Sequence, residues 1–171
     1  MTAQPHDDVA RFEHVHEVAA GADEVFAVFR APSNLARLTP RLLRPRIIEA
    51  PATITAGERL RYRIGVLGIG VEWIAEIAEW DPPRRFTDVQ VRGPYASWTH
   101  THELVPTPAG TRIRDRVDYR LRDGRLGRIV DRLVHRPFLA YLFGYRARRL
   151  EATATKSKTA QFIRYCMESR L

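Results

Sequence analysis

The chain has 171 residues, the length of one ordinary domain, and can bury a core without a disulfide. Its single cysteine, Cys166, excludes an intrachain disulfide and a cysteine-based zinc site. The formal net charge of +8 leaves nucleic acid or an anionic membrane as partners to be considered.

The expected elements begin with a strand and two short helices. A strand is predicted over Arg11–Val18, and apolar residues at helical spacing predict a helix over Ala22–Arg30. Ser33 can cap a second short helix that reaches Leu38, before Pro40 ends it.

A meander of six strands follows, because apolar and charged residues alternate through the middle of the chain. Gly68 and Gly70 suit a tight hairpin between two of them. The six predicted strands are Arg46–Glu49, Glu58–Val66, Val71–Trp80, Arg85–Val91, Tyr95–Val105 and Thr111–Leu121.

A long amphipathic helix is predicted over Arg125–Leu150, with a kink at Pro137. We divide the chain into a polar segment (1–10), one domain (11–150) and a tail (151–171) that either continues this helix or is peripheral. The element order predicts an α+β fold in which a curved, seven-stranded antiparallel sheet wraps the long helix.

The arginines of the meander fall on its predicted solvent face. Glu72 and Glu76 lie on the strand beside Arg59 and Arg61, so cross-strand ion pairs are expected. The face lacks interleaved aromatic residues and any recognition-helix pattern. We therefore expect no specific nucleic-acid partner, while weak contact with an anionic membrane surface stays open.

No apolar run approaches the ~20 residues that a membrane-spanning helix needs. Residues 1–11 are polar and lack the apolar stretch of a signal peptide. These features predict a soluble, cytoplasmic protein.

Polar side chains on inward faces are the feature that points to function. His100 and His102 share a strand face with Trp98, and Asp115 and Tyr119 point inward on the next strand. Unpaired buried polar groups cost about 1–3 kcal/mol, so these groups must satisfy one another or line a cavity.

A metal site is the third alternative for these histidines, since His-X-His on a strand can bind zinc. His14 and His16 form a second such pair. We place that pair at the surface or rim, identify no third ligand, and expect no metal and no cofactor.

The run FTDVQVRGPYASWTHTH, from Phe86 to His102, resembles the F-x-D-x-Q-x-x-G-P-Y-x-x-W-x-H-x-H stretch of bacterial ligand-binding SRPBCC proteins. Looser agreement at 32–40, 115–119 and 143–146 extends the resemblance to about residues 11–150. It implies the helix-grip fold of START domains, the birch pollen allergen and the polyketide cyclase/dehydrase group. It also marks recurring polar positions: Asp88, Trp98, His100, His102, Asp115, Tyr119 and Arg146.

The resemblance implies binding of a hydrophobic or aromatic small molecule, such as a lipid, quinone or polyketide-like compound, between the sheet and the long helix. The ligand identity and the oligomeric state are not specified. The expected ligand contacts are Tyr62, Trp73, Asp88, Trp98, His100, His102, Asp115, Tyr119 and Arg146.

Two alternative functions stay open. The first is an enzyme of the polyketide cyclase or dehydratase type, in which His100 or His102 moves a proton and Asp115 or Asp88 orients it. Tyr119 or Arg146 would stabilise an enolate oxygen. The second is an interaction module that uses the outer arginines and the tail.

Overall fold

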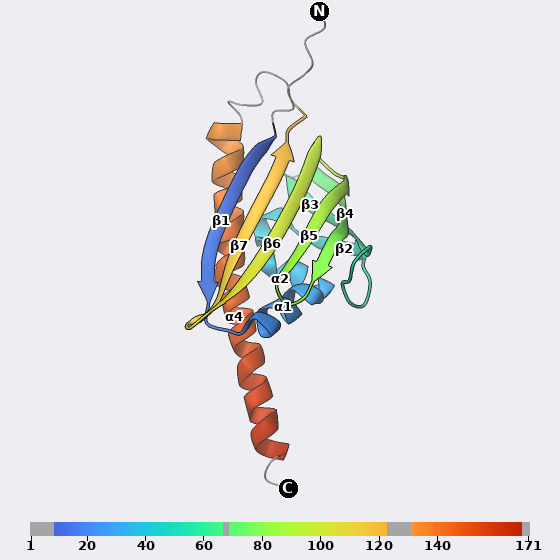
Figure 1. The fold of residues 1–171 in the computed structure, drawn as a ribbon. Coiled ribbons are helices and arrows are strands. Elements are labelled where there is room, and N and C mark those ends of the chain that lie inside the picture. Colours follow the sequence, from blue (N-terminus) through green and yellow to red (C-terminus); the bar gives the residue numbers. More distant parts are fainter. Residues whose placement is uncertain (1–8, 67–68, 123–130, 169–171) are drawn as a thin grey trace, which may run out of the picture.

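The computed structural model describes residues 9–66, 69–122 and 131–168. Its strands form one antiparallel sheet in the order β1-β7-β6-β5-β4-β3-β2, and one face of the sheet lies against a long helix (Figure 1). The seven-stranded, helix-grip prediction is therefore confirmed. The strands are β1 (Ala10–Val18), β2 (Arg46–Glu49), β3 (Arg59–Val66), β4 (Ile69–Asp81), β5 (Arg85–Arg92), β6 (Ser97–Thr107) and β7 (Gly110–Arg120).

Short helices connect β1 to β2, as expected. The predicted second helix consists of two short elements. A 3₁₀ turn begins at Pro32, and one α-helical turn continues from Leu35. The segment contains α1 (Ala22–Arg30), η1 (Pro32–Asn34), α2 (Leu35–Leu38) and η2 (Arg41–Leu43).

The long helix consists of a π-helical turn, η3 (Asp131–His135), followed by α4 (Arg136–Glu168). The expected helix start at 125–130 and Gly68 of the expected hairpin lie outside the described residues. Pro137 is the second residue of α4, directly after the change from π- to α-helix. The helix continues past residue 150, where Ala154 is still fully buried.

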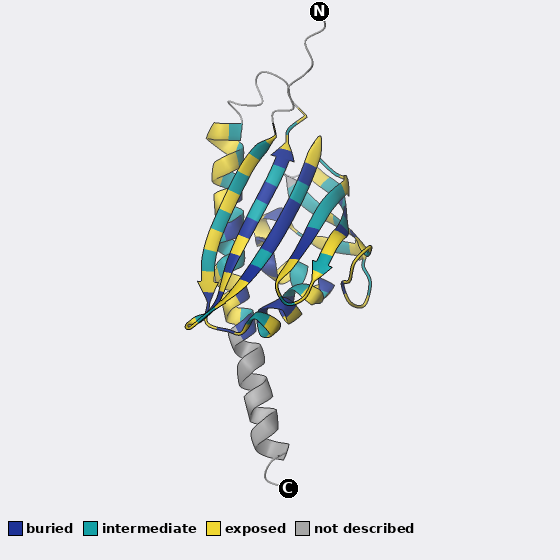
Figure 2. Ribbon diagram, in the orientation of Figure 1, coloured by how far each residue is buried: buried dark blue, intermediate teal, exposed yellow. Residues whose placement is uncertain are grey.

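Alternation along the strands separates a charged outer face from a buried inner face (Figure 2). On the outer face, Arg59 pairs with Glu76 at 2.7 Å and Arg61 with Glu72 at 3.1 Å, which confirms the expected cross-strand pairs. The two glutamates therefore partly neutralise the positive charges of these arginines.

Two larger apolar clusters cover the inner face, and a smaller one contains Ile54, Leu60 and Ile77. One larger cluster joins α1 to one end of the sheet through Phe26, Phe86 and Ile113, and α4 closes it with Leu150. The other contains Trp73, Trp98, Val117, Tyr119, Leu139 and Phe143. Between them, the middle of the inner face is polar.

Replacing Gly110 with alanine tests the turn between β6 and β7. Gly110 has φ +146°, and a Cβ there would lie 2.1 Å from the backbone oxygen of Val18. Both the strained backbone and the clash oppose any side chain. We expect Gly110→Ala to lower the free energy of unfolding by about 2 kcal/mol or more in urea titration.

Gly57→Ala is the matched control. Gly57 also has a positive φ, of +79°, but nothing lies within 4 Å of the position of its Cβ. It should cost only about 1–2 kcal/mol. Equal losses in the two variants would show that the contact with Val18 does not restrict this turn.

Candidate functional site

Strand register assembles a row of polar side chains across the inner face. Asp115 on β7 lies directly opposite His102 on β6 and His14 on β1. Asp88 on β5 lies opposite His100, which precedes His102 by two residues on β6. Two carboxylates and three imidazoles from four strands thus meet beneath α4.

His100 sits between the two carboxylates. Its Nδ1 is 3.3 Å from Asp88 Oδ2, and its Nε2 donates to Asp115 Oδ1 at 3.2 Å. Burial disfavours charge on this ring, but the two carboxylates outweigh that penalty and raise the pKa of His100. Both ring nitrogens thus face a carboxylate, which favours the protonated, imidazolium form of His100.

The carboxylates respond in the opposite direction. Burial alone would raise the pKa of Asp115, but His102 and His100 beside it hold that pKa well below its usual range. Burial opposes the charge on Asp88 as well, and the hydrogen bond from His100 leaves its pKa lowered. Both carboxylates are therefore ionised at neutral pH.

His102 differs from His100 in its charge state. Its ring stacks on Phe86 with the centroids 4.1 Å apart, and burial with the neighbouring His100 lowers its pKa to about 4. Its Nδ1 lies 2.7 Å from Asp115 Oδ1 but out of line for a hydrogen bond. His102 is thus a neutral imidazole beside a charged one.

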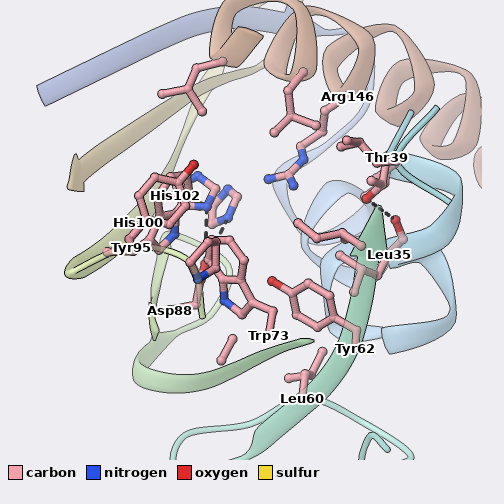
Figure 3. Close-up of a pocket in the computed structure, with 18 of the residues that line it drawn as sticks. Leu35, Thr39, Leu60, Tyr62, Trp73, Asp88, Tyr95, His100, His102 and Arg146 are labelled. Atoms are coloured by element: carbon pink, nitrogen blue, oxygen red, sulfur yellow. Dashed lines mark hydrogen bonds and ion pairs between the residues drawn. The ribbon is translucent and has the colours of Figure 1, made fainter. Parts of the chain in front are cut away.

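A pocket of about 600 Å³ lies between this polar row, β3, β4, the short helices and α4 (Figure 3). Most of its wall is apolar. Arg146 reaches in from α4, with its guanidinium 5.1 Å from the ring centroid of Phe143. Trp73 Nε1 and Arg146 Nε are buried and have no hydrogen-bond partner among the described residues.

The structure places the expected ligand contacts in two groups. Asp115 lies behind the pocket wall with its Oδ1 against His100, and the Tyr119 hydroxyl donates to Asp131 of η3. Arg146 Nε donates to neither Asp88 nor Asp115 in the described part of the chain. The expected contacts that do line the pocket are Tyr62, Trp73, Asp88, Trp98, His100, His102 and Arg146.

His14 and His16, which were expected at the surface or rim, are half-buried on the edge strand β1. Both point inward from β1 toward Asp115, and both ring nitrogens of His16 are buried without a hydrogen bond to any described residue. The alternation of Phe12, His14, His16 and Val18 along one strand face was the available sequence signal. The carboxylate of Asp115 lies beside these histidines only because β1 pairs with β7.

Two trios of side chains could hold a metal ion. His14, His16 and Asp115 form one, and Asp88, His100 and His102 form the other. In each trio the ligand atoms lie within 4.8 Å of one another. The sequence had suggested no third ligand for either histidine pair.

A second polar cluster, which sequence reasoning missed, lies at the part of the pocket wall formed by Tyr95 and His135. The Tyr95 hydroxyl is 2.7 Å from His135 Nε2, and His135 Nδ1 is 3.1 Å from Asp131. Arg136 also donates to Asp131 at 3.0 Å. These contacts fasten η3 to the ends of β6 and β7, so they position the first turn of the long helix.

The family model described as Polyketide cyclase / dehydrase and lipid transport matches residues 9–155. The chain belongs to this family. No curated protein matches its sequence.

Solved structures share the family fold at low sequence identity. The protein TTHA0849 from Thermus thermophilus has a TM-score of 0.68 and 20% identity, over 87% of this chain and 98% of that chain. A norcoclaurine synthase point mutant from Thalictrum flavum, in complex with a transition-state analogue, has a TM-score of 0.67 and 19% identity, over 88% of this chain and 96% of that chain. A major latex-like protein from Panax ginseng has a TM-score of 0.64 and 13% identity, over 84% of this chain and 96% of that chain.

In the described part of the chain, no helix carries the apolar length that crossing a bilayer requires.

Replacing Asp115 with alanine tests how far the polar row depends on this carboxylate. The change leaves His100 with one partner instead of two and removes the charge closest to His102. Breaking a buried ion pair from one side costs about 3–5 kcal/mol. We expect a loss of that size in the free energy of unfolding, measured by urea titration.

Asp118→Ala is the control on the same strand. Asp118 points outward and pairs with the exposed Arg11, so its loss should hardly move the unfolding midpoint. Similar midpoints for the two variants would contradict a special role for Asp115.

Proposed function

We propose that this protein binds a hydrophobic or aromatic small molecule in the pocket between the sheet and α4. The observation that carries the proposal is a largely apolar space of about 600 Å³ with a few polar groups on one wall. This combination is typical of small-molecule sites. A ligand of about 20 heavy atoms at roughly −0.3 to −0.4 kcal/mol per atom would reach micromolar affinity.

The polar groups of the pocket define the polar end of the ligand. Trp73 Nε1 and Arg146 Nε are donors without partners among the described residues. Burial raises the pKa of Tyr62 well above its usual value, so its hydroxyl also keeps its proton. Asp88, the acceptor on this wall, already faces His100. A ligand that brings oxygen acceptors, as a quinone or a polyketide does, satisfies these donors.

The family description supports a role with ligands of this kind, since it names polyketide cyclases and lipid transport. The norcoclaurine synthase structure supports small-molecule binding by this fold, because it was solved in complex with a transition-state analogue. The cytoplasmic location and the absence of a cofactor stay predictions.

Acid–base catalysis of the cyclase or dehydratase type is the second candidate. The observation in its favour is a charged His100 and a neutral His102 side by side on the pocket wall, with ring centroids 3.9 Å apart. One ring can donate a proton and the other can accept one, while Asp88 and Asp115 orient His100. Arg146 is placed to stabilise a developing enolate.

Enlarging a side chain inside the pocket tests ligand binding. Ala75 is buried on β4 and lines the pocket, whereas Ala78 on the same strand is exposed. Ala75→Phe should weaken binding of the fluorescent hydrophobic probe 8-anilinonaphthalene-1-sulfonate at least about 10-fold, because it fills space the probe needs. Ala78→Phe should bind the probe as the wild type does.

Leu142→Trp narrows the pocket from α4 and serves as a second variant if Ala75→Phe does not fold. Circular dichroism establishes folding of each variant before titration. Unchanged probe affinity in the folded pocket variants would overturn the proposal.

Separate substitutions of the two histidines test the catalytic candidate. If the protein cyclises or dehydrates a poly-β-ketone substrate, His100→Gln and His102→Gln should each lower kcat about 100-fold or more. Probe binding should persist, because neither change fills the pocket. Turnover that survives both substitutions would exclude acid–base catalysis by this pair.

A further inference from the structure

A second group of potential ligands lies on the far side of Asp115 from the pocket. His14 and His16 project from the same face of β1, two residues apart, and Asp115 is the direct strand partner of His14. None of the three lines the pocket. The group is therefore distinct from the proposed ligand site and does not depend on that proposal.

Three of the four imidazole nitrogens of this group lack a hydrogen-bond partner among the described residues. His14 Nδ1, His16 Nδ1 and His16 Nε2 are all buried without a hydrogen bond in the described part of the chain. The rings of His14 and His16 lie near each other, with centroids 5.2 Å apart. Buried imidazole nitrogens ordinarily bind a donor, an acceptor or a metal ion.

The two oxygens of Asp115 have different surroundings. Oδ1 faces His100 and His102, at 3.2 and 2.7 Å. Oδ2 is directed to the other side, 4.0 Å from His16 Nδ1. One oxygen is thus committed to the pocket wall, and the other is available on the β1 side.

We infer that His14, His16 and Asp115 form a binding site for a divalent transition-metal ion of the zinc class. Two imidazoles and one carboxylate are ligands that such ions accept, and three protein ligands leave one position open. The ligand atoms lie within 4.8 Å of one another. Ligand atoms on a tetrahedral zinc are about 3.3 Å apart, so small side-chain rotations complete the site.

The surrounding residues suit this assignment. The hydrogen bond between His100 and Asp115 fixes the orientation of the carboxylate, as outer-shell partners do in metal sites. Glu151 of α4 partly offsets the positive charge that Arg146 brings near His16. In the other trio, His100 already directs both nitrogens to carboxylates. The first trio is therefore the better site.

Metal titration of the full chain, with any affinity tag removed, tests the inference. We expect one Zn²⁺ per chain by isothermal titration calorimetry, and Co²⁺ should give the intense visible absorption of a tetrahedral site. His16→Gln should weaken Zn²⁺ binding about 100-fold or more, since it removes a direct ligand. His14→Gln should weaken it similarly and keeps the test valid if His16→Gln does not fold.

Asp118→Asn is the matched control, because Asp118 lies on the same strand as Asp115 but points outward and pairs with the exposed Arg11. It should bind Zn²⁺ as the wild type does. Absence of stoichiometric binding, binding that both histidine variants retain, or binding that Asp118→Asn abolishes would each overturn the inference. Circular dichroism of the metal-free variants separates loss of a ligand from loss of the fold.

Discussion

The buried carboxylate of Asp115 is the constraint on which the centre of this structure depends. A fully buried charge is costly unless partners compensate it, and here the compensation comes from the hydrogen bond with His100, while His102 contacts the same oxygen. Those partners exist only if β7 and β6 pair in one register. A slip by one residue would turn Asp115 to the outer face, so the polar row also specifies the alignment of the strands.

The same row divides the interior into two parts. On one side, Leu104 and Ile113 belong to the cluster closed by α1 and Leu150. On the other, Trp98 and Val117 belong to the cluster closed by the first turns of α4. The polar groups between the clusters require satisfied hydrogen bonds and thus form a wall with fixed geometry. The pocket opens directly on that wall, where an apolar ligand and a few polar contacts can meet.

Local sequence pattern was sufficient for much of the fold. Period-two alternation identified the strands and the outward arginines, because each strand buries one face only. It also placed His100, His102 and Asp115 inward. The alternation does not show how deep an inward side chain lies within the interior. Asp115 and Tyr119 share their face with pocket residues, but they lie behind the wall because neighbouring rings and η3 cover them.

Long-range pairing limited the sequence analysis of the histidines on β1 in the same way. His14 and Asp115 are about a hundred residues apart in the chain, and only the closing pair of strands joins them. A pattern within one strand identifies a face, but it does not identify the neighbour across the sheet. The missed trio has this origin, whereas the missed contacts of Asp131 with Tyr119 and His135 are close in sequence and depend on how η3 packs on the sheet.

The charges around the pocket narrow the chemistry of its ligand further. Asp88 and Asp115 carry two negative charges, and protonated His100 and Arg146 carry two positive ones, so the wall is neutral as a whole. A neutral carbonyl oxygen can accept from Trp73 or Arg146 without upsetting this balance, whereas a carboxylate brings a charge that lacks compensation. A divalent cation on His14 and His16 would change this preference. It would add positive charge behind Asp115 and favour an anionic ligand, and by linkage such a ligand would tighten the binding of the cation.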